Sequence, residues 1–335
     1  KVMSRKLITI STIMTLMSTS VIADVPNVAA DIAPIHSLVS RVMDGVGAPK
    51  LIVQSGASPH GYRLRPSEAK ALQDADHVFW MGEELTPWLD SAIGTLASKA
   101  SVTTLLDQQG VILHDFREGA LFEAHDHSAH GDDDHDDHDD HKDHDDHDDH
   151  DDHDDHKDHD DHYDHGSHDP HAWLSPENAK LWLNIIASKL SVSDPENAAT
   201  YFMNAAAGQA EIEAMIAEVK ATLKPVQGGK FVVFHDAYQY FENDFDFYAS
   251  GAISLGDSSD PSPARIEKVQ KRIRDEGIQC VLAEPQFKKG LVATVMEGSD
   301  ATASVIDPLG AELETGPKLY TRLIKNMAKT LRNCL

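Results

Sequence analysis

The chain has 335 residues, of which 41% are hydrophobic, and it carries a formal net charge of −27. This length is sufficient for two domains of ordinary size. The acidic balance argues against a nucleic-acid partner, because phosphate binding needs clusters of Lys and Arg, and the sequence contains no such cluster. Cations are the expected partners.

The N-terminal stretch has the pattern of an export signal. Arg5 and Lys6 precede an apolar stretch, residues 7–22, which Ser and Thr interrupt. A short positive head, an apolar middle and compact residues before a cleavage point are typical of a secretory signal peptide, whereas a membrane span needs about 20 strongly apolar residues. We expect residues 1–23 to be a signal peptide and the mature chain to be exported and soluble.

Short apolar runs alternate with helical patterns over the next 85 residues or so. Strands are predicted over 25–32, 51–54, 78–81 and 102–106, and helices over 34–43, 66–74 and 86–97. Alternation of this kind produces βαβ units and a parallel sheet.

A run of histidine and aspartate follows. From His135 to His171 a histidine stands at every third position, 13 in a row, and nearly all residues between them are Asp. Residues 126–164 contribute −19 of the net charge, so the remainder of the chain is only mildly acidic, at −8. A segment with almost no apolar residue cannot bury a core, and we expect it to be disordered. An acidic solubilising tract needs carboxylates only, whereas a regular histidine register indicates binding of transition-metal ions.

The second half of the chain repeats the alternation after two helices. Ser175 is the expected N-cap of a helix to about residue 190, and Asp194-Pro195-Glu196 opens a second, unusually long helix to about Leu223. Strands are then predicted over 231–234, 248–253, 281–283 and 304–306, and helices over 236–243, 262–276, 291–297 and 317–333.

The predicted fold class is therefore α/β, with two lobes that each contain a mostly parallel sheet flanked by helices and that are joined by a long linking helix. We expect the N-terminal lobe over residues 24–193, including the His/Asp-rich insertion at 115–167. The linking helix should cover residues 194–225, and the C-terminal lobe residues 226–335.

Candidate metal ligands follow from this order of elements. In open parallel sheets, ligands bind beyond the carboxyl ends of the strands. His60 lies in a loop after one predicted strand, His235 and Asp307 directly follow two others, and His171 precedes the helix capped by Ser175. Three imidazoles and one carboxylate would form a tetrahedral zinc site. One such histidine alone is more often structural, and the joint placement of the four residues favours a site.

Other histidines compete for these roles. His168 is a rival to His171, because both belong to the same three-residue register. His36, His77 and His114 occupy positions typical of structural residues, so we leave them outside the site.

The two cysteines, Cys280 and Cys334, have no C-x-x-C partner, which argues against a thiolate metal site. In an exported protein we expect them to form a disulfide, although two buried thiols are the alternative.

Several motifs together resemble one family. They are DIAPIHSL at 31–38, SPH at 58–60, LRPS at 64–67, HAWLSP at 171–176, FHDAY at 234–238, AEPQF at 283–287 and DPLG at 307–310. In this order, and with a His/Asp-rich insertion, they resemble the zinc-binding periplasmic component of an ABC importer, of the ZnuA type in the cluster A-I group. The match spans essentially the whole mature chain.

The resemblance implies a set of metal ligands. The family's histidines would correspond to His60, His171 and His235, and the related manganese carriers have a glutamate at the last position. Three nitrogens favour zinc over a hard ion. Pro59 replaces a glutamate that some members use as a ligand, so the fourth donor would be Asp307 or water.

The resemblance also implies a Cys280–Cys334 disulfide, a periplasmic location, a long helix between the lobes, and delivery of Zn²⁺ to an inner-membrane ABC permease with a cytoplasmic ATPase. The chain would be a monomer and not an enzyme, and its His-rich loop would collect zinc weakly. Two alternatives are a metal-binding surface adhesin or zinc-buffering protein, and a zinc hydrolase. The hydrolase is disfavoured because no H-E-x-x-H helix is present.

Overall fold

The computed structural model describes residues 25–117, 121–122, 168–254, 256, 261–287 and 289–335. The expected signal peptide at 1–23 and most of the insertion at 115–167 lie outside these residues. Within the described part of the chain, no helix has the length and apolar character that crossing a membrane would require.

The N-terminal lobe contains a four-stranded parallel sheet in the order β2-β1-β3-β4. Its elements are β1 (Val28–Ala30), α1 (Ala33–Val42), β2 (Lys50–Leu51), α2 (Pro66–Gln73), β3 (His77–Trp80), α3 (Pro87–Leu96) and β4 (Ser101–Thr104). The central strands β1 and β3 are buried along their whole length, which explains their nearly continuous apolar sequence.

The C-terminal lobe repeats this arrangement, with a parallel sheet in the order β6-β5-β7-β8. Its elements are β5 (Phe231–His235), α6 (Gln239–Phe245), β6 (Ala252–Ser254), α7 (Pro263–Glu276), β7 (Cys280–Ala283), α8 (Lys289–Met296), β8 (Thr302–Val305) and α9 (Leu319–Cys334).

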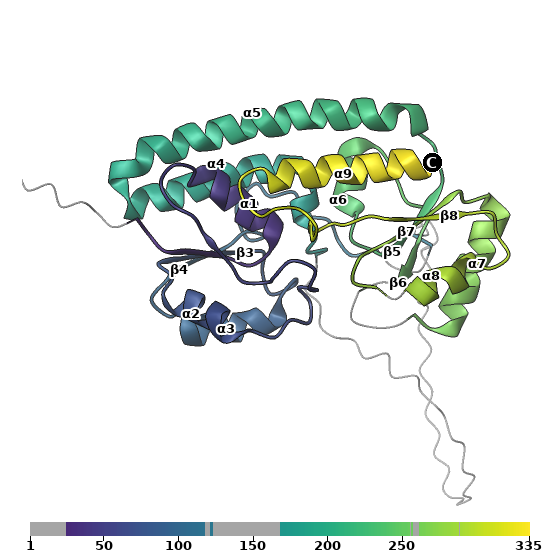
Figure 1. The fold of residues 1–335 in the computed structure, drawn as a ribbon, viewed down its shortest axis with the longest axis horizontal. Coiled ribbons are helices and arrows are strands. Elements are labelled where there is room, and N and C mark those ends of the chain that lie inside the picture. The colour runs from purple at the N-terminus through teal and green to yellow at the C-terminus, as the bar shows by residue number, and fades with distance from the viewer. Residues whose placement is uncertain (1–24, 118–120, 123–167, 255, 257–260, 288) are drawn as a thin grey trace, which may run out of the picture.

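Two helices connect the lobes, α4 (Pro176–Ser193) and α5 (Ala198–Leu223). Ser175 caps α4 by accepting a hydrogen bond from the backbone N–H of Asn178, as predicted. The long helix begins later than predicted, because Asp194 caps a short 3₁₀ turn over Pro195–Asn197 before α5 starts. Figure 1 shows α5 extending over both lobes.

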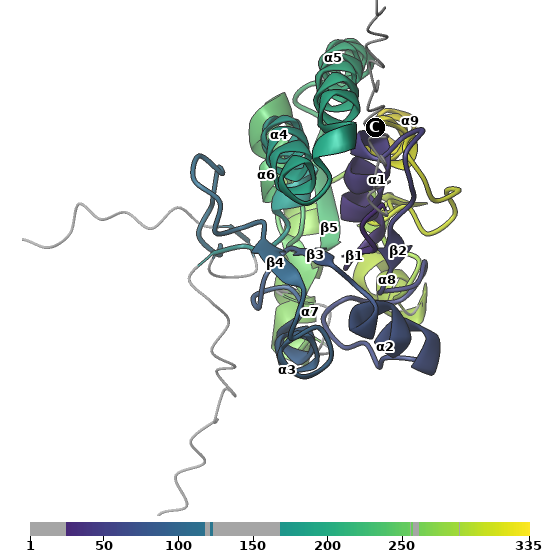
Figure 2. The ribbon, with the colours of Figure 1, turned by 90° about the vertical axis from the view of Figure 1, so that its left-hand side faces the viewer.

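Helices cover both faces of the sheets. Figure 2 shows α4, α5 and α9 on one side of the strands and α2, α3 and α7 on the other. One apolar cluster contains residues of both sheets together with α1, α4, α5 and α9, whereas two smaller clusters lie beneath α2 and α3 and beneath α7 and α8. The two lobes therefore share one continuous core.

Gly208 allows the connecting helices to approach closely. A Cβ atom at this position of α5 would lie 2.9 Å from Leu183 Cδ1 of α4 and 3.1 Å from Arg41 Cγ of α1. The glycine, which is unfavourable inside a helix, is explained by this contact.

The two cysteines form a disulfide, with a Cα–Cα distance of 5.6 Å. It joins the end of α9 to the first residue of β7, so the alternative of two free thiols was wrong.

Every strand and helix predicted from the sequence is present in the part of the chain that the structure describes, with shifted boundaries. Among the shifted boundaries, α6 begins at Gln239 instead of 236, and β6 begins at Ala252 instead of 248. Asp246 adopts a left-handed conformation and ends α6, and the chain then reaches its neighbouring strand only at Ala252. The α/β fold with two lobes and a long helix between them is confirmed.

Candidate metal centre

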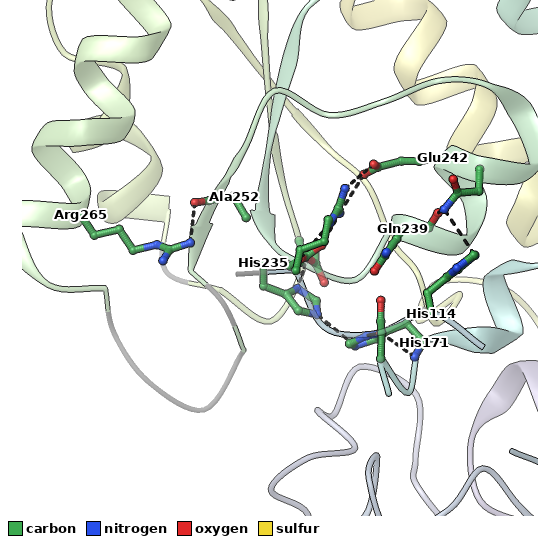
Figure 3. A network of polar contacts seen from close by, with 12 residues as sticks. His114, His171, His235, Gln239, Glu242, Ala252 and Arg265 are labelled. Atoms are coloured by element: carbon green, nitrogen blue, oxygen red, sulfur yellow. Dashed lines mark hydrogen bonds and ion pairs between the residues drawn. The ribbon is translucent and has the colours of Figure 1, made fainter. Parts of the chain in front are cut away.

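Three histidines from distant parts of the chain meet between the two lobes. His60 lies in the loop after β2, His171 directly precedes a 3₁₀ turn over Ala172–Leu174, and His235 is the last residue of β5. One ring nitrogen of each lies within 4.8 Å of the others. In Figure 3, the rings of His171 and His235 point toward each other, and their Nε2 atoms are 3.4 Å apart.

This spacing suits a single metal ion. Zinc–nitrogen bonds of about 2.0–2.1 Å in tetrahedral geometry place two bound nitrogens roughly 3.3 Å apart. His171 and His235 are 5% and 3% exposed, whereas His60 is half-buried. The group therefore has two buried donors and a third that lies nearer to solvent.

Two buried carboxylates orient the imidazole rings. Asp169 Oδ1 lies 2.6 Å from His171 Nδ1, and Glu284 Oε1 lies 2.5 Å from His235 Nδ1. Because a carboxylate only accepts hydrogen bonds, each Nδ1 carries the proton and each Nε2 keeps its lone pair toward the other histidines. The rings are thus held in the tautomer that binds a metal through Nε2.

Further contacts fix these carboxylates in place. Gln286 donates from Nε2 to Glu284 Oε2 at 2.8 Å, and the backbone N–H of His171 donates to Asp169 Oδ1 at 3.0 Å. Burial raises the pKa of Asp169 to about 6. A bound cation would favour the charged carboxylate, so metal binding and ionisation of Asp169 are expected to support each other.

The His60 loop is held by aromatic and acidic neighbours. Trp88 donates from Nε1 to the carbonyl of Pro59 at 2.7 Å. Tyr62 donates to Glu68 Oε1 at 2.8 Å, and Glu68 Oε2 accepts the backbone N–H of Arg65 at 2.7 Å. These contacts tie both sides of His60 to α2 and α3.

Asp307, the fourth predicted ligand, follows β8 but does not belong to the group of three histidines. Its Oδ1 accepts the backbone N–H of Leu309 at 3.0 Å and of Gly310 at 2.8 Å, and its Oδ2 accepts that of Ala311 at 2.5 Å. The carboxylate therefore stabilises the turn that follows β8.

The other histidines considered have different surroundings. His168, the rival to His171, is half exposed and pairs with Asp115 through a ring contact of 3.0 Å and an antiparallel bridge, so the two ends of the insertion meet there. Ring nitrogens of His36 and His77 lie 3.2 Å from the Pro49 carbonyl and 2.6 Å from Ser193 Oγ. His114 contacts Asn243 at 3.3 Å. These contacts agree with structural roles.

Sequence reasoning gave no role to Asp169 and Glu284. Asp169 is hidden among the many aspartates of the insertion, although it stands only two residues before His171. Glu284 directly follows β7, and a carboxylate at the carboxyl end of a buried parallel strand was a usable signal.

Two α/β lobes around a ligand position, joined by a long helix, define a solute-binding protein. The fold is similar to a solved structure described as "Crystal structure of ZnuA", with a TM-score of 0.69 and 20% identity over 93% of this chain and 99% of that one.

The chain belongs to the family described as "Zinc-uptake complex component A periplasmic", whose model matches residues 28–334. It is 50% identical to the high-affinity zinc uptake system protein ZnuA of Brucella abortus, over 92% of this chain and 91% of the relative. The protein of the same name from Paracoccus denitrificans is 46% identical, over 93% of each chain. Members of this family are binding proteins rather than enzymes, which decides against a hydrolase.

Proposed function

We propose that the protein captures Zn²⁺ between its lobes through His60, His171 and His235 and delivers it to an inner-membrane ABC permease with a cytoplasmic ATPase. The observation that carries this proposal is the convergence of three ring nitrogens within 4.8 Å, two of them on rings oriented by buried carboxylates. The names of the relatives, which are zinc uptake proteins, support the choice of ion.

The donor set favours zinc over harder ions. Three neutral imidazoles suit zinc, copper and nickel, whereas manganese and magnesium prefer carboxylate and water oxygens. Copper and nickel bind nitrogen sites at least as well as zinc, so cellular availability would contribute to selectivity.

For the fourth position we propose Asp307 or a water molecule. If Asp307 coordinates zinc, Asp307→Asn should weaken zinc binding by about tenfold or more, since the anionic donor is lost. If water is the ligand, Asp307→Asn should leave zinc affinity nearly unchanged, because the amide oxygen still accepts part of the turn's hydrogen bonds.

Metal content and competitive chelator titration test the site. His60→Ala and His235→Ala should each lose the tightly bound ion while weakly bound ions remain. His168→Ala is a matched control, because His168 lies in the same register as His171 but pairs with Asp115. Retention of the tight ion in both site variants would refute the proposal.

We further propose that the His/Asp-rich tract gathers several zinc ions weakly and raises their concentration near the site. Deleting residues 126–164 should reduce the number of zinc ions bound and leave the tight one. An unchanged stoichiometry would contradict this role. Acidification toward pH 6 should discharge the tract first, because zinc needs neutral imidazole and the flanking Asp charges favour protonation.

The remaining expectations belong to the same proposal. Residues 1–23 would direct export to the periplasm, and the mature protein would act as a monomer. Residues 24–193 and 226–335 would form the lobes around the linking helix at 194–225. Nothing in the part of the chain that the structure describes favours the alternative of a surface adhesin or zinc-buffering protein.

A further inference from the structure

The first residues of the insertion reach across to the C-terminal lobe. Its Arg117 contacts Asp236 and Glu242, which lie after β5 and in α6. Nε lies 3.0 Å from both oxygens of Asp236, Nη1 lies 2.6 Å from Glu242 Oε2, and Nη2 also contacts both carboxylates. The guanidinium therefore binds two carboxylates of the opposite lobe at once.

This ion-pair cluster is buried. The side chains of Arg117, Asp236 and Glu242 are 16%, 7% and 1% exposed. Breaking a buried charge pair is far more costly than breaking one on the surface, because the remaining charge stays without a partner in a medium of low dielectric constant. The contact is thus a strong link between the lobes, unlike an ordinary surface salt bridge.

Neighbouring residues strengthen the same link. The guanidinium of Arg117 stacks on the Phe122 ring, with its Cζ atom 3.6 Å from the centre of the ring. Arg272 of α7 donates from Nη1 to the carbonyl of Leu121 at 2.6 Å. Both ends of the insertion also contact Tyr240 of α6. Its hydroxyl accepts the backbone N–H of His114 at 3.1 Å and donates to the Asp169 carbonyl at 2.7 Å.

The cluster is directly connected to the metal ligands. Asp236 is the residue after His235, and Asp169 orients the ring of His171. Figure 3 shows His235, His171 and Glu242 within one network of polar contacts. Helices α4, α5 and α9 join the lobes on one side of the sheets, whereas the Arg117 cluster joins them at the histidines themselves.

We propose that Arg117 is a positioning residue for cation capture, a clamp between the lobes that holds His171 and His235 at metal-binding separation before the ion arrives. The proposal rests on the zinc-binding function assigned above. A ligand set that is already assembled loses less conformational entropy on binding, and an error of about 1 Å in such a set is costly. Arg117 itself does not touch the ion.

Zinc affinity of the full mature chain is the first test. Arg117→Gln should weaken the tight site by about tenfold, the lower end of the range for residues that support metal ligands. Arg41→Gln is the matched control, because Arg41 of α1 makes a comparable two-nitrogen contact with Glu211 of α5, at 3.1 Å for each nitrogen, away from the site. Its zinc affinity should stay within about twofold of wild type.

The distance between the lobes is the second test, and it separates positioning from general destabilisation. Spin labels at Ser98→Cys and Arg274→Cys, one on each lobe, report this distance in the zinc-free protein, since both native cysteines are in the disulfide. Arg117→Gln should broaden the distance distribution, and saturating zinc should narrow it again. Arg41→Gln should leave the distribution unchanged.

Two experimental outcomes would contradict the proposed clamp. Unchanged zinc affinity in Arg117→Gln, or weaker affinity with an unchanged distance distribution, overturns the clamp. If Arg117→Gln fails to fold, the same two measurements are made on Arg117→Lys, which keeps the buried charge but loses the forked contact. The zinc-free distance measurement tests the clamp even if His60→Ala and His235→Ala refute zinc binding.

Discussion

The side chain of Glu284 is fully buried and does not belong to the group of three histidines, yet it decides how the His235 ring is turned. Its two oxygens accept hydrogen bonds from His235 and Gln286, so rotation of the ring would leave a buried acceptor without its donor. The residue would therefore act on the proposed ion through the orientation of His235.

Replacing Glu284 by Gln should weaken zinc binding by about tenfold, because the neutral amide holds the His235 ring less firmly and makes it a poorer donor. Competitive titration measures this change. Glu267→Gln, an exposed acid-to-amide change on α7, is the control and should have no effect. Equal affinities for the Glu284→Gln variant and wild type would contradict the orienting role.

Asp31 is a second buried acid, remote in sequence from the three grouped histidines. Its oxygens accept the backbone N–H groups of Ile32 and Met81 at 2.7 Å each, and burial raises its pKa to about 7. Between the unfolded pKa near 3.8 and the folded pKa near 7, the folded protein holds a proton that the unfolded chain has lost. The contribution of Asp31 to the unfolding free energy is therefore fully present below pH 3.8 and decreases as the pH rises toward 7.

Asp31→Asn should remove this pH dependence. Between pH 5 and 6 the unfolding free energy of wild type should fall more steeply with pH than that of the variant, by up to about 1.4 kcal/mol per pH unit. Chemical denaturation of the zinc-free protein at a series of pH values measures both slopes. Parallel slopes would show that Asp31 does not titrate in this range.

Single residues also show how far sequence reasoning extends. His60 and His235 could be placed because the carboxyl end of a parallel strand is a local property with a general meaning. The partners of Arg117 could not, because they lie 119 and 125 positions away and no periodicity connects them. Choosing His171 over His168 required the family motif in the sequence, and the structure brings His171 to the other two histidines.

At the scale of elements, hydrophobic pattern and capping residues were sufficient to predict each helix and strand. Pro at the first turn and a Ser cap mark both α4 and α7. The predicted ends of the strands were less accurate than those of the helices, because a strand extends only as far as a neighbouring strand pairs with it. The two-residue strand β2 is an example, since it pairs with β1 alone at the edge of its sheet.

The disulfide connects two such elements and should contribute mainly through the unfolded chain. Cys280→Ala combined with Cys334→Ala should lower the unfolding free energy by about 4 kcal/mol, given the sequence separation of 54 residues. Denaturation under oxidising conditions measures the loss, and reduced wild type should match the double variant. Zinc affinity should remain unchanged, because neither sulfur lies at the site.

For the whole molecule, the shared core predicts small lobe movements. The cluster that contains residues of both sheets and of α5 would have to open if the lobes rotated apart. A continuous helix also resists hinge bending more than a flexible linker does.

Zinc binding should therefore change the radius of gyration by less than about 1 Å, as in other pre-organised complexes. Small-angle scattering of a chain lacking residues 126–164, with and without one equivalent of zinc, measures this difference without the contribution of the tract. A compaction of several ångströms would indicate a clamshell motion and contradict the shared core as a restraint.

The bridge between Asp115 and His168 has a consequence for the length of the His/Asp-rich segment. Because its two ends already meet, the positions of the flanking residues do not depend on how many residues the segment contains. Doubling the number of residues in a flexible loop costs only about 0.6 kcal/mol of closure entropy. Histidine-aspartate triplets could thus be added or removed almost without thermodynamic penalty, so the zinc-collecting capacity that we propose for the tract could change independently of the three grouped histidines.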